Sequence, residues 1–362
     1  MRMIHCADLH LDSKMSKLEH RSRERKAELL QTFEDMIAFG AAHGVDAVLI
    51  AGDLFDTKNV SRTASNAVLS YIRSNPQMQF YYLKGNHDND NFLAEVEKLP
   101  ENLHMFQKDW SYYNLGGITI AGVELCAENA GSIYHSLVLD TSRFNVVMLH
   151  GQEAEAMGKD RAEVVHLKSL QNKGIDYLAL GHVHSYKQKQ LDARGTYCYP
   201  GCLEGRGFDE CGEHGFVLLD IDGENRKYTH QFIPFAKRRL YTVEADISDC
   251  TTSAEIVPCI SAALEAEGCE ESSLVKIVLT GTVDVECEKD LDYLLSRFRN
   301  DYYFVKMEDQ SGLRVSLEDY RLDETLKGEF IRLVMADTGL SEEDKATIIR
   351  YGLQALAGEE VV

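Results

Sequence analysis

Short apolar runs alternate with amphipathic stretches along the first two thirds of the chain. Residues 45–51 form an apolar run with β-branched side chains, a pattern that is typical of a buried strand. Residues 21–42 instead carry Leu29, Phe33 and Met36 at helical spacing. Strands that alternate with helices predict an α/β fold. Further strands are predicted at residues 1–7, 79–83, 144–149 and 175–180, and further helices at residues 61–74 and 162–172.

Two segments of the same region depart from this alternation. Residues 114–124 contain a Gly-Gly turn between alternating apolar residues, which is consistent with antiparallel strands. Residues 186–235 show short apolar stretches separated by glycine-rich turns. This order favours a two-sheet β-sandwich flanked by helices over a single wound sheet.

The pattern begins anew after the basic stretch at residues 237–239, where the composition also changes. Strands are predicted at 241–245, 275–279 and 302–307, helices at 253–267 and 290–298, and two amphipathic helices at 323–336 and 341–357. We therefore predict three parts, namely a large N-terminal domain at residues 1–238, a small α/β domain at 239–316 and a helical pair at 317–362.

Charge changes what this chain can bind. The net charge is −21, and residues 240–362 hold 27 acidic against 11 basic residues. A negative surface repels free nucleic acid, so any contact with DNA depends on local basic patches or bound cations. One candidate patch spans residues 14–26, with six basic residues against two acidic ones. The start of a solvated helix explains this patch about as well.

Other features exclude several classes of protein. No apolar run approaches the length of a membrane span, and the N-terminus turns polar too early for a signal peptide, so we expect a cytoplasmic protein with no membrane contact. The nine cysteines are odd in number and include no Cys-x-x-Cys pair. Neither a disulfide framework nor a zinc knuckle is therefore indicated.

Polar side chains that can bind metals follow five of the predicted strands, just where each strand ends. Strand ends of one sheet lie side by side, so these residues can converge although they are far apart in the sequence. Carboxylates, an amide oxygen and imidazoles form a mixed ligand set that suits manganese, iron or zinc. The five motifs are Asp8-x-His10, Gly52-Asp53-x-x-Asp56, Gly85-Asn86-His87-Asp88, His150-Gly151 and Gly181-His182-x-His184.

This constellation resembles the calcineurin-like metallophosphoesterase superfamily, over roughly residues 1–235. The resemblance implies that the large domain is a catalytic domain with two divalent metal ions, which we expect to be Mn²⁺, with iron or zinc as alternatives. It implies that Asp53 bridges both ions. Asp8, His10 and His184 would complete one metal site, and Asn86, His150 and His182 would complete the other.

The same resemblance implies roles in catalysis. His87 would stabilise the transition state or protonate the leaving oxygen, and Asp88 would orient its ring. Two cations about 3.5–4 Å apart can hold a hydroxide for in-line attack and neutralise both the attacking and the departing oxygen. Arg206 follows the last histidine motif and is a candidate phosphate contact, although an ordinary turn explains its surroundings equally well.

Simpler explanations suit the neighbouring polar residues. His5 lies inside the first predicted strand and is expected to be a packing residue. Asp12 and Asp56 are expected to form hydrogen bonds or helix caps, with Asp56 close enough to support the metal ligands. The remaining histidines have no motif neighbours, and no role is assigned to His43, His104, His135, His166, His214 and His230.

Within the superfamily the chain resembles the bacterial DNA repair exonucleases, the SbcD-type and YhaO-like nucleases, on residues 4–12, 52–56 and 199–206. The resemblance implies a DNA repair exonuclease or endonuclease that acts on DNA ends. A phosphodiesterase or phosphatase for small nucleotides is the alternative, because the acidic second domain is unexpected for a module that touches DNA. A third hypothesis is a non-catalytic scaffold for an SMC-like ATPase.

The resemblance also implies partners. The second domain would be a cap that selects DNA, and the C-terminal helical pair would dock on an SMC-like ATPase through Leu326, Phe330, Leu333 and Val334. Packing of these helices within the chain is an equally good explanation. A homodimer is implied through segments near residues 62–72 and 91–97, neither of which is decisively apolar.

Overall fold

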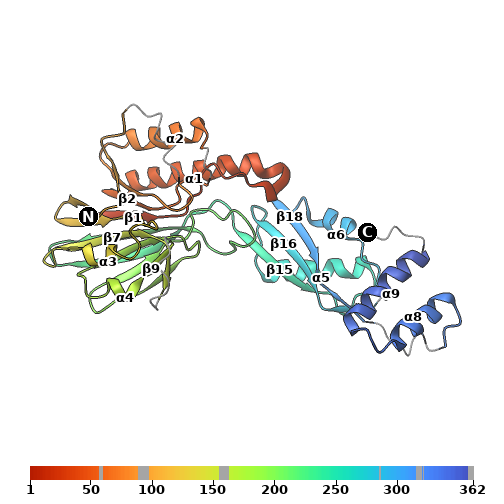
Figure 1. Ribbon diagram of the computed structural model, residues 1–362. Helices are drawn as coiled ribbons and strands as arrows, with labels where there is room; N and C mark the ends of the chain where they lie inside the picture. The colour runs from red at the N-terminus through yellow and green to blue at the C-terminus, as the bar shows by residue number, and fades with distance from the viewer. Residues whose placement is uncertain are drawn as a thin grey trace. The chain divides into compact units, whose positions relative to one another are not determined.

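The computed structural model (Figure 1) describes residues 1–56, 60–88, 98–154, 163–284, 287–314, 320 and 322–357. The chain divides into two compact units, Met1–Arg239 and Leu240–Val362, and each is described by itself. No helix in the described part of the chain combines the length and the apolar character needed to cross a membrane.

Two six-stranded sheets build the N-terminal unit. The first sheet holds, in spatial order, β14 (Lys227–Pro234), β13 (Gly215–Asp222), β1 (Arg2–Cys6), β2 (Ala47–Ala51), β3 (Gln79–Leu83) and β4 (Leu103–Met105). The second holds β11 (Lys187–Gln190), β12 (Thr196–Tyr199), β10 (Tyr177–Gly181), β7 (Phe144–His150), β6 (Ile118–Gly122) and β5 (Ser111–Leu115). The prediction of a two-sheet sandwich flanked by helices is confirmed.

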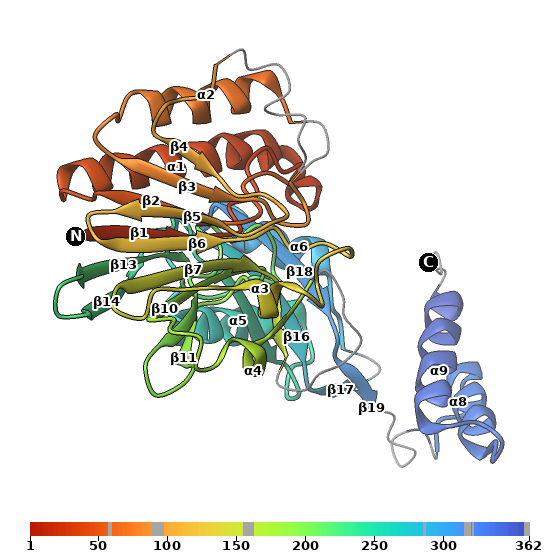
Figure 2. The same ribbon diagram turned by 60° about the vertical axis from the view of Figure 1, so that its left-hand side comes forward.

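Helices cover the outer faces of both sheets. Figures 1 and 2 show α1 (Ser22–Ala42) and α2 (Arg62–Arg73) over the first sheet. The short helices α3 (Ile133–Ser136) and α4 (Leu167–Leu170) pack on side chains of β7 and β10 in the second sheet. Central strands such as β2 are thus buried on both faces, which explains why their sequences are apolar throughout.

The main core lies between the two sheets. Alternate side chains of β1 and β2, among them Met3 and Leu49, meet Ile120, Val146 and Met148 of the second sheet in one buried cluster. Successive side chains of a strand point to opposite faces, so Val48 and Ile50 are left to face the helical layer. This packing fixes the strand ends of both sheets relative to each other.

The helix predicted at residues 162–172 is wrong in the part that the structure describes. Residues 164–166 form β9 (Val164–His166), which pairs in parallel with β8 (Gln152–Ala154), and only α4 is helical. Two β-branched valines favour the extended conformation at the start of this segment. At its end, Gln171 is extended and Asn172 has φ of 60°, so the helix cannot continue.

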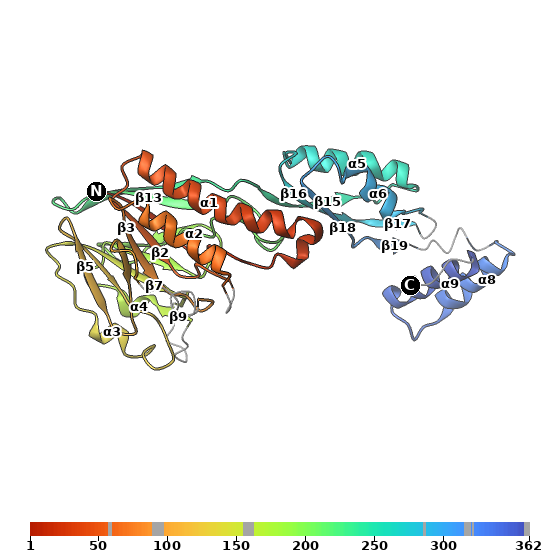
Figure 3. The same ribbon diagram turned by 90° about the horizontal axis from the view of Figure 1, so that it is seen from above.

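The C-terminal unit contains a parallel sheet of β15 (Leu240–Asp246), β16 (Leu274–Thr280) and β18 (Phe304–Asp309). Figure 3 shows α5 (Ser253–Ala266) and α6 (Leu291–Phe298) beside this sheet. Their side chains Ile256 and Leu294 are buried in one cluster with Val243 and Ile277 of the sheet. Two short strands, β17 (Thr282–Asp284) and β19 (Gly312–Arg314), form a separate parallel pair.

Two helices, α8 (Leu326–Ala336) and α9 (Glu342–Ala357), end the described chain. Ile331 and Ile349 are fully buried between them, and Phe330 and Val334 pack against the same cluster. Leu326 and Leu333 are each 68% exposed. Of the segments suggested for a dimer, residues 62–72 fall in α2, and residues 91–97 lie outside the described residues.

Candidate metal centre

The five predicted motifs meet where the strand ends of the two sheets come together. The loop after β1 is bonded to the loop after β2, because the Asp8 amide donates to Gly52 O at 3.1 Å and the His10 amide to Asp53 O at 2.9 Å. The loop after β10 joins them, because the His182 amide donates to both carboxylate oxygens of Asp8 at 3.0 and 2.9 Å. Backbone hydrogen bonds therefore place the candidate ligands before any metal binds.

Four of these residues adopt a backbone conformation that side chains usually avoid. The φ angles are 52° at Asp8, 44° at His10, 50° at Asp53 and 101° at His182. Such a conformation costs on the order of 1–3 kcal/mol per residue and persists where the surrounding structure enforces it. Its concentration in one loop cluster is typical of a functional site.

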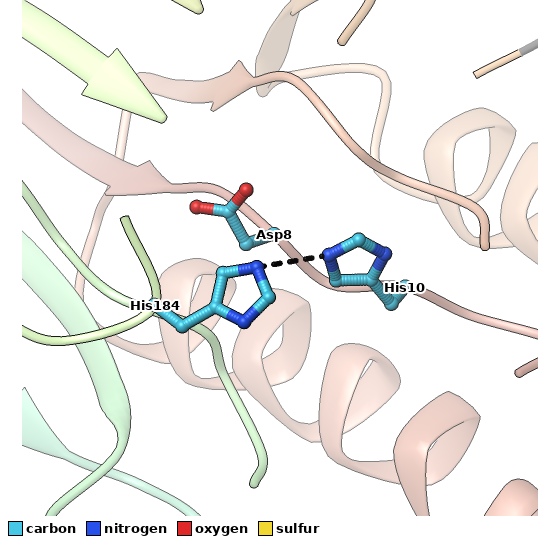
Figure 4. A group of neighbouring side chains, drawn as sticks. All are labelled: Asp8, His10 and His184. Carbon is cyan, nitrogen blue, oxygen red and sulfur yellow. Dashed lines mark hydrogen bonds between the residues drawn. The ribbon is translucent and has the colours of Figure 1, made fainter. Parts of the chain in front are cut away.

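One group of candidate ligands consists of Asp8, His10 and His184 (Figure 4). One ligand atom from each lies within 4.8 Å of the others. The Nε2 atoms of His10 and His184 face each other at 3.2 Å. Two imidazole nitrogens at this distance require a proton or a metal ion between them, since two lone pairs would repel.

A carboxylate lies beside the far nitrogen of each ring. Asp56 Oδ1 lies 3.3 Å from His10 Nδ1, and Glu210 Oε1 lies 2.6 Å from His184 Nδ1. Burial lowers the pKa of His10, whereas Glu210 outweighs burial and raises the pKa of His184. The hydrogen bond between His184 Nδ1 and Glu210 leaves His184 Nε2 to coordinate a metal, an arrangement that is frequent in metal sites.

A second group consists of Asp8, Asp53 and His150. His150 Nε2 lies 3.4 Å from Asp53 Oδ2 and 3.0 Å from Asn86 Oδ1, while its Nδ1 lies 2.9 Å from Ala51 O. The ring of His182 stands edge-on to that of His150, with centroids 5.4 Å apart. The structure thus brings together all seven residues predicted as metal ligands.

Asp53 lies between the two groups. Its Oδ2 is 3.8 Å from His10 Nε2, in addition to its contact with His150. Burial opposes the charge of Asp53, but the hydrogen bond from His150 and the charges of both histidines hold the pKa of this carboxyl well below its usual value. Burial likewise opposes the charge of His150, yet Asp53 and Asp8 raise the pKa of His150 to about 9. The negative charges of Asp53 and Asp8 thus favour a cation next to them, at the position of the His150 ring.

Two glycines let these loops approach closely. Gly52 has φ of 95°, and a Cβ there would lie 2.1 Å from His150 Nδ1. A Cβ at Gly85 would lie 2.2 Å from Asp53 Oδ1. Both positions therefore exclude a side chain, which explains why the motifs of Asp53 and of Asn86 begin with glycine.

The candidate catalytic residues His87 and Asp88 have different surroundings. The side chain of His87 is 48% exposed, and its Nδ1 lies 3.7 Å from Asp56 Oδ1. The partly buried Asp88 carboxylate accepts from the backbone amides of Gly85 and Phe55, both at 2.9 Å. Burial raises the pKa of Asp88 to about 6. We expected Asp88 to orient His87, but these bonds brace two loops, and Asp56 lies beside the ring instead.

Arg206 reaches the centre from the loop after β12. Its NH1 lies 3.2 Å from Asp56 Oδ1 and its NH2 lies 2.9 Å from Glu210 Oε1. We predicted Arg206 as a candidate phosphate contact and Asp56 as a residue that supports the metal ligands, whereas Glu210 was not predicted. The only signal for Glu210 was its position four residues after Arg206 in a glycine-rich loop.

A family model described as calcineurin-like phosphoesterase matches residues 1–186, which is just over half of the chain. The chain belongs to the calcineurin-like phosphoesterase family. This confirms the resemblance drawn from the five motifs. Members of the family use a dinuclear metal site, and the two groups of Asp and His described above could hold such a pair of ions.

Several curated proteins are similar to this family member. It is 30% identical over 248 residues to the uncharacterized metallophosphoesterase YhaO of Bacillus subtilis, covering 64% of this chain and 60% of that protein. It is 24% identical over 351 residues to the DNA double-strand break repair protein Mre11 of Methanosarcina acetivorans, covering 93% of this chain and 53% of that protein. A shorter match, 37% over 107 residues, joins it to one of the subunits of the nuclease SbcCD from Rhodobacter capsulatus, covering 28% of this chain and 25% of that protein.

The chain spans only 60% and 53% of the lengths of the first two of these relatives. The activities of those whole proteins are therefore not assigned to this chain, and they serve only to choose the experiments.

A pocket of about 680 Å³ lies beside the metal centre of this phosphoesterase family member, and both Asp56 and Arg206 line it. Lys14, Lys17 and Lys26 line it too, so part of the basic patch predicted at residues 14–26 does face the site. Arg25 does not contribute, because it is fully buried in an ion pair with Glu204.

Proposed function

We propose that this protein is a metal-dependent phosphodiesterase, and that its substrate is DNA, cleaved at or near its ends. The observation that carries the proposal is the position of Asp53 Oδ2 between the donor groups of His10 and His150. A carboxylate shared by two sets of imidazoles is the arrangement that two neighbouring divalent cations need. The mixture of carboxylate, amide and imidazole donors suits Mn²⁺.

The ions, when bound, supply Lewis-acid charge to the phosphate oxygens and activate water. The protein keeps Asp53 ionised through its contacts with His150 and His10. It fixes the ring of His150 through the hydrogen bond between Nδ1 and Ala51 O, so that Nε2 points to Asn86 and Asp53. These contacts orient the donors in advance and reduce the reorganisation that binding requires.

His87 is our candidate for the residue that protonates the leaving oxygen. Its backbone amide donates to Asp53 Oδ1 at 2.9 Å, which ties the residue to the metal centre. Its half-exposed ring packs edge-on against His10 with centroids 5.2 Å apart, and Asp56 lies beside its Nδ1. A proton donor at the rim of the site can reach a leaving group without being a metal ligand.

Two observations support DNA as the substrate. The relatives include proteins named for DNA double-strand break repair and a nuclease subunit. The pocket beside the metal centre carries Lys14, Lys17 and Lys26, which can hold phosphates on either side of the one being cleaved. Lys26 is paired with Asp12 at 2.7 Å and Lys17 lies 3.9 Å from Asp209, which leaves Lys14 as the better candidate.

One observation favours a second function, the hydrolysis of a small phosphodiester. Residues 240–362 carry 27 acidic and 11 basic residues, and a domain of this charge repels a DNA backbone. A small nucleotide needs no contact with that domain.

We further propose an SMC-like ATPase as a partner of the helical pair α8 and α9. The support is the exposure of Leu326 and Leu333, together with a relative that is named as one subunit of a nuclease. The other two residues of the predicted apolar face, Phe330 and Val334, pack inside the pair. Binding of a purified SMC-like ATPase should weaken in the double variant Leu326→Asp/Leu333→Asp, and equal binding would argue against this partner.

The deciding experiment compares a linear DNA duplex with a chromogenic phosphodiester in the presence of Mn²⁺. Wild type should cleave both, and Asp53→Asn should cleave neither. His87→Ala should lose DNA cleavage while still binding its metal ions, which metal analysis checks. Hydrolysis of the small ester without any DNA cleavage would replace the nuclease by the second function. Absence of both activities would revive the scaffold hypothesis.

A further inference from the structure

The histidines of the two metal groups are held in different ways. In the group of Asp8, His10 and His184, a side-chain carboxylate lies beside each ring: Asp56 Oδ1 is 3.3 Å from His10 Nδ1 in an ion-pair contact, and Glu210 Oε1 is hydrogen-bonded to His184 Nδ1 at 2.6 Å. In the group of Asp53 and His150, a backbone carbonyl, Ala51 O, lies at His150 Nδ1. A backbone carbonyl is placed by the strand, whereas a carboxylate needs a partner to place it.

Arg206 is the shared partner of these two carboxylates. Its guanidinium bonds to Asp56 through NH1 and to Glu210 through NH2, and its backbone amide donates to Glu210 Oε2 at 2.7 Å. Ser13 completes the arrangement by donating to Asp56 Oδ2 at 2.9 Å. One planar group thus links the supports of two rings that lie 174 positions apart in the chain.

The sequence made Arg206 a candidate phosphate contact, but its side chain has few atoms free to bind a phosphate. Its Nε is buried and has no hydrogen-bond partner in the described part of the chain, so this atom is not available to a phosphate. Its two terminal nitrogens are already bonded to carboxylates. Removal of the guanidinium would leave Asp56 and Glu210 without the cation that bonds to both, and like charges would then push the two carboxylates from their positions.

We propose that Arg206 is a positioning residue for one metal ion only, the one held by Asp8, His10 and His184. It acts on His10 through Asp56, and on His184 through Glu210 and through the 3.5 Å contact of its own NH2 with His184 Nδ1, and it leaves the ion at Asp53 and His150 unaffected. This inference rests on the proposed metal-dependent function, but it concerns metal binding and can be tested without a substrate.

The test is a titration of the metal-free protein with Mn²⁺, followed by calorimetry and by electron paramagnetic resonance. Wild type should bind two ions that are magnetically coupled. Arg206→Met should bind one ion as tightly as wild type and the second 10–100-fold more weakly, as is typical when a residue that supports a ligand is lost. At intermediate Mn²⁺ its spectrum should therefore be that of an isolated ion.

Two further variants keep the test decisive. Glu210→Gln should show the same selective loss, because it removes the charge at His184 while Arg206 remains. Arg194→Met is the matched control: it removes an arginine that pairs with Asp176 at 2.7 Å, away from the metal groups, and it should keep two coupled ions. Thermal unfolding checks that each variant is folded.

The outcomes separate the two proposals. Two ions bound with wild-type affinity in Arg206→Met would overturn the positioning role, and a raised KM for DNA in that same variant would make Arg206 a substrate contact. Equal weakening of both ions would also overturn it, since the effect would not be selective. If wild type itself bound no pair of ions, the proposed function would fail first, independently of Arg206.

Discussion

His10 and His184 face each other Nε2 to Nε2 at 3.2 Å, although 174 positions separate them in the chain. The first follows β1 of one sheet and the second follows β10 of the other. Their contact shows that the centre is built where two sheets meet, so the packing of the sandwich core and the geometry of the metal site depend on each other.

Metal binding is expected to stabilise the folded protein. An ion that binds only the folded state at 100 times its dissociation constant adds about 2.7 kcal/mol. Thermal unfolding with Mn²⁺ should therefore occur at a higher temperature than with a chelator, and Asp53→Asn should abolish most of the difference. Glu224→Gln, a change at an exposed turn, serves as the control and should keep it. An undiminished shift in Asp53→Asn would mean that Mn²⁺ binds elsewhere.

Replacement of Asp56 should lower the catalytic rate, whereas replacement of Asp88 should lower the stability of the fold. Asp56→Asn should lower kcat by 10–100-fold at saturating Mn²⁺, because Asp56 lies beside both His10 and His87.

Asp88→Asn should cost about 1–3 kcal/mol of stability, because an amide cannot accept from all the backbone donors that the carboxylate accepts. Urea unfolding and steady-state kinetics distinguish the two effects. If Asp88→Asn reduced kcat without loss of stability, that result would support the orienting role expected for Asp88.

The convergence of the candidate metal ligands could be predicted because their positions are local signals. Each follows an apolar run at a strand end, and parallel strands bring such ends together whatever the loops do. Glu210 could not be found this way. It contacts His184 through the fold of a long loop, and its sequence neighbours carry no periodicity.

The same limit explains two other errors. Residues 164–166 were predicted to be part of a helix. They form a strand because they pair with β8, and this tertiary contact is not visible in the local sequence. Arg25 was predicted to belong to a basic patch. Its buried partner Glu204 lies 179 positions away in the sequence, so the local sequence shows no sign of the ion pair. In each case a partner that is distant in the sequence determines the local structure. The spacing of apolar and polar residues along the chain does not reveal that partner.

The buried pair of Arg25 and Glu204 gives a test of stability. Arg25→Met should cost about 3–5 kcal/mol, because it leaves the Glu204 charge buried without its partner. Adding Glu204→Gln should recover part of this loss, since a neutral amide can still accept from Thr32 and from the Lys237 amide. Urea unfolding of wild type, both single variants and the double variant measures the coupling. Additive losses would show that the two side chains do not stabilise each other.

The buried imidazole of His5 should make the protein sensitive to acid. Burial lowers the pKa of His5 to about 3, well below the usual value of 6.5, and the Tyr177 hydroxyl lies 2.9 Å from its Nδ1. Between pH 6.5 and about 3 the unfolded chain binds a proton at this residue that the folded protein does not. Stability is therefore complete above pH 6.5 and falls as the pH decreases, by about 1.4 kcal/mol per pH unit from this group alone.

His5→Gln should remove that contribution. Measured by urea unfolding in the presence of a chelator, its stability should fall less steeply than that of wild type from pH 6.5 to pH 5, by about 2 kcal/mol in total over this interval. Tyr177→Phe is the matched control, because it removes the hydroxyl but keeps the buried imidazole and hence the steep profile. Parallel profiles for wild type and His5→Gln would show that His5 is protonated in the folded protein over this range, and the acid sensitivity would then have to come from the other buried groups.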